Sequence, residues 1–126
     1  MNGDEIYQDL FELMEPELPG NWTEAVLYAE YGESSYEIEF FVKDGEGGVM
    51  KCYDLPGAAV DEYYSLFEEM DSILSKDRSD PDKGQPWSTM TMTVKRTGDF
   101  KVDYTYDDVL EDPLAAKDSW RKQYLD

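Results

Sequence analysis

The chain has 126 residues, few enough for one domain, and its 40% hydrophobic content is sufficient for one core. Thirty acidic residues against eleven basic ones give a formal charge of −19, which repels nucleic acid and anionic membrane surfaces. Histidine is absent, so the sequence lacks the commonest general base and the usual partner of a serine or cysteine nucleophile. We therefore expect a basic protein as the partner, with no binding of nucleic acid or membrane.

The first part of the chain predicts one helix followed by three strands. Apolar side chains recur every three or four positions over residues 4–15, which indicates an amphipathic helix, and prolines after it favour its end there. Alternating runs over 23–31 and 36–43 predict a hairpin. A short third strand is expected at about 49–53.

The second part predicts a longer helix, a hairpin and a final helix. A helix over 58–76 places apolar residues on one side at intervals of three and four. The run over 87–109, WSTMTMTVKRTGDFKVDYTYDDV, predicts two alternating strands around a turn at Gly98. Asp112–Pro113 is a favourable start for a last helix over 113–125. Five side chains of the hairpin are expected to face the core: Met90, Met92, Val94, Phe100 and Val102.

These elements predict an α+β fold, in the order α-β-β-β-α-β-β-α, as a single domain over residues 1–126. Consecutive hairpins imply a largely antiparallel sheet, and we expect the helices to pack together on one face of it. The lone cysteine, Cys52, is expected to be a small core residue. Because the sequence has no recognisable signal peptide or membrane-spanning run, it favours a cytoplasmic protein.

The negative charge is concentrated in the first two thirds of the chain. Residues 1–82 hold 22 acidic and 4 basic side chains, a net charge of −18, whereas residues 83–126 hold 8 and 7, a net charge of −1. Charge that served only solubility would not need to be segregated, so the split favours a directed surface for a basic partner. The candidate partner-binding residues lie on the second predicted strand and helix: Glu37, Glu39, Asp61, Glu62, Glu68, Glu69 and Asp71.

An alternative partner face is formed by Asp103, Asp107 and Asp108, towards the end of the second hairpin. Adjacent aspartates could also suggest carboxylate chemistry, but neighbouring strand residues point to opposite faces. Close carboxylate pairs are in any case inevitable among thirty acidic residues. No glycine-rich phosphate loop accompanies them. We therefore expect no enzymatic activity, no cofactor and no metal site.

Motifs in the last third, and a stretch near the start, carry a resemblance to a known family. Residues 85–109 read QPWSTMTMTVKRTGDFKVDYTYDDV, residues 120–125 read WRKQYL, and residues 22–31 read WTEAVLYAEY. In these stretches the chain resembles the YezG-like antitoxin/immunity proteins of bacteria, and the similarity runs along essentially its whole length. One departure is Arg121, where the family pattern has lysine after the tryptophan.

The resemblance implies a cytoplasmic protein that binds and neutralises a cognate secreted toxin, typically a nuclease of the LXG or YeeF-like type. A nuclease must attract phosphate, so its cleft is basic, and an acidic protein could occupy that cleft as a nucleic-acid backbone does. The clearest motif lies in the nearly neutral third of the chain, so we expect it to specify the fold. The helix over 4–15, the strand over 36–43 and the helix over 58–76 are then expected to meet the toxin. A toxin-export chaperone or adaptor without direct inhibition is the alternative.

Overall fold

The computed structural model describes residues 4–32, 36–55, 60–79, 86–106 and 113–125. Those residues confirm the predicted order of elements and the α+β class. None of the helices in these ranges is long and apolar enough to cross a membrane. In chain order the elements are α1 (Asp4–Met14), the 3₁₀ helix η1 (Glu15–Glu17), β1 (Trp22–Tyr31), β2 (Tyr36–Asp44), β3 (Val49–Lys51), the 3₁₀ helix η2 (Cys52–Asp54), α2 (Val60–Arg78), β4 (Thr89–Lys95), β5 (Phe100–Thr105) and α3 (Pro113–Tyr124).

The strands form one antiparallel sheet in the order β3-β2-β1-β4-β5. β1 lies at the centre, and its residues from Ala25 to Ala29 are all buried. Both faces of this strand are covered, so its sequence is nearly continuously apolar instead of alternating. β3 and β5 are the two edge strands of the sheet.

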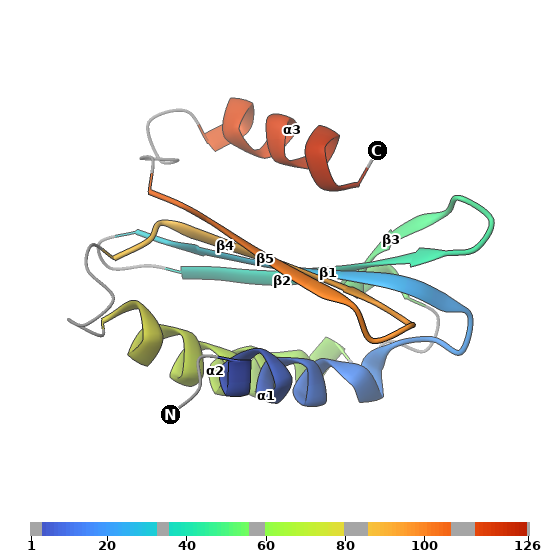
Figure 1. Ribbon diagram of the computed structural model, residues 1–126, viewed down its shortest axis with the longest axis horizontal. Coiled ribbons are helices and arrows are strands. Elements are labelled where there is room, and N and C mark those ends of the chain that lie inside the picture. Colours follow the sequence, from blue (N-terminus) through green and yellow to red (C-terminus); the bar gives the residue numbers. More distant parts are fainter. Residues whose placement is uncertain (1–3, 33–35, 56–59, 80–85, 107–112, 126) are drawn as a thin grey trace.

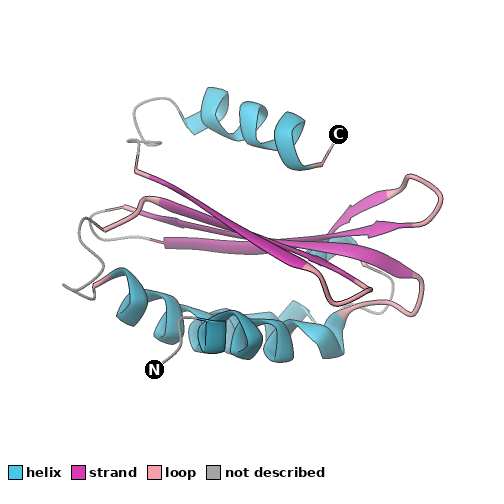
Figure 2. Cartoon of the chain, in the orientation of Figure 1, coloured by secondary structure: helices cyan, strands magenta, loops and turns pink. Residues whose placement is uncertain are grey.

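α1 and α2 cover one face of the sheet (Figure 1, Figure 2). The apolar row that they bury comes from alternate strand residues such as Leu27, Phe40 and Met92, each 0% exposed. Tyr63 of α2 places its ring 5.7 Å from the Phe40 ring and donates its hydroxyl to the Cys52 carbonyl oxygen at 3.1 Å. Cys52 lies in this core, as its sequence context predicts, and burial raises the pKa of its thiol.

α3 covers the opposite face, so the prediction that the helices share one face is wrong (Figure 1). Trp120 of α3 packs against the rings of Tyr28 and Phe41, with centroid separations of 4.7 and 5.2 Å. Its indole N–H donates to the Thr91 hydroxyl at 2.8 Å. α3 lies on this face because β1 and β2 are apolar on both sides. Val26, Tyr28 and Phe41 form a second apolar row, which needs a cover of its own.

β5 is less buried than expected. The three core residues predicted on β4 are buried, whereas Phe100 is 49% exposed and Val102 is half-buried. Phe100 points to the α1 side, as expected, and its ring lies 5.9 Å from the Tyr7 ring. It is not buried there, because a strand at the end of a sheet has a neighbouring strand on one side only. Gly98, in the turn between β4 and β5, has a φ of +101°, as its predicted turn role requires.

Candidate partner-binding surface

The helices divide the charge of the protein between the two faces of the sheet. α1 and α2 together contain ten acidic and two basic residues, a net charge of −8. α3 contains one acidic and three basic residues, a net charge of +2. Because α1 and α2 lie on the face opposite α3, an acidic helical layer faces away from a weakly basic one (Figure 1). The charge of the helices is thus split between the two faces of the sheet.

The exposed side of α2 combines carboxylates with a tyrosine. Asp61, Tyr64 and Glu68 follow one another at spacings of three and four residues, which places them in a row along the helix. All three are exposed, and Tyr64 is 73% exposed. Tyr36, at the start of β2, is 44% exposed and stacks with its ring 5.8 Å from the Tyr31 ring. Burial, and then the charges of Asp71 and Glu68, raise the pKa of Tyr36. Aromatic surface and negative charge together suit the recognition of arginine and lysine.

A shallow hollow of about 380 Å³ lies between α1 and α2. Asp9 and Glu12 of α1 and Glu69 of α2 line it, around an apolar floor of Leu13 and Ile73. Three carboxylates from two helices therefore surround one small apolar depression. The sequence predicts a role for the first helix but does not single out Asp9 or Glu12. Only the packing of α1 against α2 brings them beside Glu69.

Six exposed carboxylates form what we call the acidic helix face: Asp9, Glu12, Asp61, Glu62, Glu68 and Glu69. Within the described part of the chain, none of the six takes part in an ion pair. Their field is therefore not neutralised by neighbouring lysine or arginine and extends into solvent over a Debye length, about 8 Å at physiological salt. Four of the six, those on α2, are among the residues that the sequence predicts.

Asp71 has a structural role at the margin of the acidic helix face. Tyr31 of β1 donates its hydroxyl to Asp71 Oδ1 at 2.6 Å, and the Arg78 guanidinium lies 5.4 Å from the centre of the Tyr31 ring. Burial, and then the hydrogen bond to Asp71, raises the pKa of Tyr31. Asp71 thus connects α2 to the central strand of the sheet.

Glu37 and Glu39 of β2 lie on the α3 side of the sheet, away from the acidic helix face. Glu39 is only 2% exposed and forms ion pairs with Lys51, at 2.9 Å, and with Lys117 of α3. Lys117 also lies over the Tyr28 ring, 4.1 Å from its centroid. Glu39 is therefore a buried structural residue and is not available to a partner, whereas Glu37 is exposed. Strand alternation predicts the face of both residues but not the helix that covers one of them.

Glu39 should make the stability of the protein depend on acid pH. Burial acts to raise its pKa, but hydrogen bonds from Lys117 and Lys51 outweigh it and hold the pKa below the ordinary value of 4.5. Such a carboxylate contributes stability above its unfolded-state pKa and loses it as the pH falls through the folded-state pKa. Below pH 4.5, the free energy of unfolding should therefore fall more steeply for the native chain than for Glu39→Gln. Urea titrations measure both, and parallel curves would contradict this role.

Of the alternative partner face, only Asp103 lies among the described residues; Asp107 and Asp108 lie outside them. Asp103 accepts a hydrogen bond from the Tyr124 hydroxyl at 2.8 Å, and Lys101 Nζ is 3.6 Å from it. Burial, and then the bond to Asp103, raises the pKa of Tyr124 to about 12. Asp103 is thus half-buried against the end of α3 and helps to hold that helix on the sheet.

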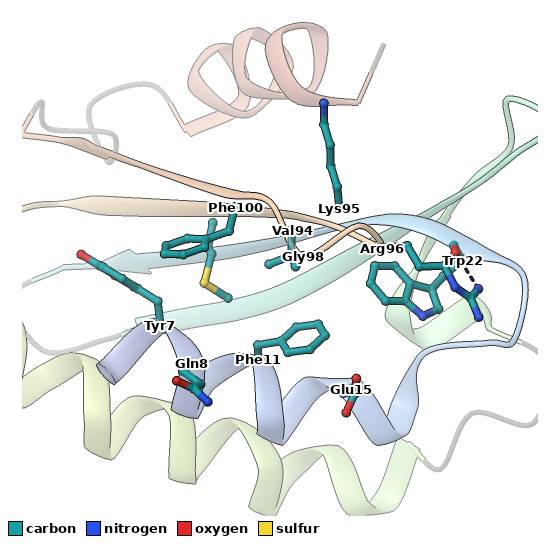
Figure 3. A pocket seen from close by; sticks show the side chains of 11 residues that line it. Tyr7, Gln8, Phe11, Glu15, Trp22, Val94, Lys95, Arg96, Gly98 and Phe100 are labelled. Atoms are coloured by element: carbon teal, nitrogen blue, oxygen red, sulfur yellow. Dashed lines mark hydrogen bonds between the residues drawn. The ribbon is translucent and has the colours of Figure 1, made fainter. Parts of the chain in front are cut away.

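An apolar hollow of about 390 Å³ lies between α1 and the β4–β5 hairpin (Figure 3). Phe11, Trp22 and Phe100 contribute to its walls. Arg96, at its rim, donates to the carbonyl oxygens of Gly20 and Trp22 at 2.6 and 3.0 Å, so its charge holds the hairpin against the start of β1. Across the described ranges, no group of three or more histidine, cysteine or acidic side chains is placed to hold a metal ion.

Comparison with known proteins identifies the family. The family model described as "Immunity protein YezG-like" matches residues 4–126. The chain belongs to the YezG-like immunity protein family. Immunity protein YezG of Bacillus subtilis strain 168 is 28% identical over 116 residues, which cover 87% of this chain and 77% of the relative. Immunity protein YezG of Bacillus spizizenii strain W23 is also 28% identical over 116 residues, which cover 87% and 72%.

Membership of the YezG-like family confirms the resemblance carried by the sequence motifs. It supports an immunity role for this chain, and an immunity protein has a cognate toxin as its partner. Two tryptophans of the motif that lie among the described residues are not on one surface. Trp87 and Trp120 are buried on opposite faces of the sheet, in the α1/α2 core and under α3 respectively. These two motif residues therefore serve packing, and the role of the rest of the motif stays a prediction.

Proposed function

We propose that this YezG-like protein binds and neutralises its cognate toxin through the acidic helix face, and that the toxin domain is a basic nuclease. The observation that carries the proposal is the set of six exposed carboxylates on α1 and α2, which lack ion-pair partners within the described residues. Carboxylates exposed in this way are ready to pair with the lysine and arginine side chains of another protein.

A nuclease presents such side chains in its substrate cleft, because it must attract phosphate. The acidic helix face would cover that cleft and exclude nucleic acid from it. Complementary charge also raises the rate of encounter, which matters when the toxin is lethal to the cell that makes it. We place this action in the cytoplasm, where the nucleic acid of the producing cell needs protection.

Tyr64 is the expected aromatic anchor of this surface. It is 73% exposed and lies between Asp61 and Glu68, so a partner would bury a ring that contributes little to the fold. Tyr64→Ala should weaken toxin binding by about 2 kcal/mol, roughly 30-fold, and change the free energy of unfolding by less than about 0.5 kcal/mol. Calorimetric titration and thermal unfolding measure the two quantities.

The matched control is Tyr106→Ala. Tyr106 is 53% exposed and directly precedes Asp107 and Asp108 in the sequence, far along the chain from α2. If Tyr106→Ala weakens binding and Tyr64→Ala does not, the partner meets the alternative face and the proposed surface is wrong.

The function itself is tested with two purified proteins. The full chain is titrated into the C-terminal domain of the toxin encoded beside it, and cleavage of plasmid DNA and of RNA is measured. The expected result is a loss of cleavage that is complete near one equivalent of the chain. Unchanged cleavage, with an effect only on toxin yield or secretion in cells, would indicate the export chaperone instead. A toxin domain that cleaves neither nucleic acid would overturn the nuclease assignment.

A further inference from the structure

The outer edge of β5 is a second surface of the molecule with a specific recognition pattern. β5 ends the sheet, and its exposed side chains include Phe100, at 49%, and Lys101. An edge strand presents unpaired backbone N–H and C=O groups, and native proteins usually protect such an edge. Lys101 is a charged residue of the protective kind, but Phe100 leaves an aromatic ring half exposed beside the edge, which suits a partner.

The backbone hydrogen bonds of β4 show which groups of β5 point outwards. Lys95 N–H donates to the carbonyl oxygen of Asp99 at 2.8 Å, across the turn to β5. Arg96 N–H donates to the carbonyl oxygen of Thr23 in β1, on the other side of β4, at 2.9 Å. Odd-numbered residues of β4 therefore bond to β5, and the register pairs Thr93 with Lys101. By the alternation of antiparallel ladders, Lys101 and Asp103 turn their backbone groups towards β4. Phe100, Val102 and Tyr104 turn theirs outwards.

The side chains of β5 are complementary to themselves in one register. If a second copy of β5 pairs antiparallel with the first, centred on Val102, then Lys101 of each copy lies opposite Asp103 of the other. Phe100 lies opposite Tyr104 of the second copy, and Val102 lies opposite its own equivalent. In this register the paired residues that exchange hydrogen bonds are the three whose backbone groups point outwards. Opposite charges and aromatic pairs placed directly across two strands are both stabilising.

The surroundings of the edge also permit a second copy. Residues 83–126 carry a net charge of only −1, so the repulsion that −19 would cause between whole chains is weakest here. The side of α1 nearest β5 presents Tyr7, Gln8 and Phe11 to the apolar hollow (Figure 3). Asp9 and Glu12 line the other hollow, between α1 and α2. A strand added to β5 would pass beside the Phe100 ring and reduce the exposure of this hollow.

We propose that the chain forms a two-fold symmetric dimer through antiparallel pairing of β5 with β5 of a second copy, centred on Val102. The five-stranded sheets of the two copies become one continuous sheet, and the interface is isologous. Both acidic helix faces remain uncovered. The interface is smaller than a standard one, so the expected dissociation constant is about 10 to 100 µM.

Sedimentation velocity of the full chain over a range of concentrations tests the association. The expected result is a shift from 14.6 kDa to twice that mass as the concentration passes the dissociation constant. Lys101→Asp should keep the chain monomeric, because it places a carboxylate directly opposite Asp103 of the second copy. Lys101→Asp/Asp103→Lys should restore the dimer by exchanging the charges, and circular dichroism checks that α3 stays in place without the hydrogen bond from Tyr124 to Asp103. Lys122→Asp changes the net charge by the same amount on the exposed side of α3 and should leave the dimer intact.

Val102→Pro provides a test through the backbone. The Val102 N–H points outwards, so proline removes a donor that the monomer does not use, and the fold should persist by circular dichroism. The dimer should be lost. A native chain that remains monomeric up to about 1 mM would overturn the proposal. A dissociation constant above about 1 mM corresponds to a free energy of association below about 4 kcal/mol. A dimer that survives both Lys101→Asp and Val102→Pro would also overturn it.

The register is tested by cysteine cross-linking with oxidised glutathione. Lys101→Cys mixed with Asp103→Cys should form an interchain disulfide, because residues directly opposite in a non-hydrogen-bonded pair have Cα atoms about 4.5 Å apart. Either variant alone should not cross-link, since positions offset by two residues lie about 7–8 Å apart. Cys52 is buried and does not interfere. Cross-linking of one variant with itself, and not in the mixture, would contradict the register.

Discussion

Replacement of the four carboxylates of α2 in the acidic helix face by lysine should slow association with the toxin domain by about 10- to 100-fold at low salt. The reason is that the change reverses the field of the layer that we propose to meet the basic cleft. The four positions are exposed and lack ion-pair partners within the described residues, so the fold should be retained. Stopped-flow mixing measures the rate. The variant carries Asp61→Lys, Glu62→Lys, Glu68→Lys and Glu69→Lys.

A matched variant separates the position of charge from its amount. It reverses four exposed carboxylates outside the acidic helix face: Glu37, Glu46, Asp99 and Asp118. Both variants change the net charge equally, so any general effect of charge should be the same in both. If the matched variant slows association as much as the α2 variant, the acidic helix face is not the specific surface. Because Glu37 is included, the comparison also tests whether the exposed carboxylate of β2 contributes.

Trp120→Ala should destabilise the fold by about 4 kcal/mol, the cost of removing a large buried ring from a packed site. Trp120 is 8% exposed, its ring packs between Tyr28 and Phe41, and its N–H donates to Thr91. Small domains are typically stable by about 5–15 kcal/mol, so this loss would leave the chain marginal at best. Urea unfolding followed by circular dichroism measures the change.

The control for Trp120→Ala is Gln123→Ala, on an exposed position of the same helix. Gln123→Ala should lower the free energy of unfolding by less than about 0.5 kcal/mol, since it leaves the packing of α3 unchanged. A cost below about 1 kcal/mol for Trp120→Ala would mean that α3 contributes little to the fold. The second apolar row of the sheet would then need another cover.

Much of the fold follows from periodicity in the sequence. The alternation of Met90, Met92 and Val94 with three threonines predicts β4, and the structure buries the three apolar residues. The placement of α3 does not follow in the same way. Its stripe of Ala116, Trp120 and Tyr124 shows that one side is apolar but not which face of the sheet it meets. That choice depends on the second apolar row of the central strands, which only the assembled sheet creates.

The sequence predicts that the candidate surface is negatively charged, but it identifies only some of the residues that form it. The exposure of Asp61, Glu62, Glu68 and Glu69 agrees with the helical period, which separates them from the apolar side of α2. The same period does not predict that Asp71 is half-buried against Tyr31. Glu39 has the same sequence signal as Glu37, and a tertiary contact with Lys117 decides that it is buried. Local pattern predicts the direction of a side chain relative to its own element, whereas its availability depends on what packs above it.

The association rate of the full chain with the toxin domain, measured as a function of ionic strength, tests the acidic helix face most directly. If that face captures the toxin, the rate of the native chain should fall steeply as salt rises. The dependence should be nearly flat for the α2 variant and unchanged for the matched variant. The opposite result would be a native-like salt dependence in the α2 variant, with the loss appearing only when Asp103 and its neighbours Asp107 and Asp108 are neutralised. That outcome would contradict the proposed surface and assign the toxin to the alternative partner face.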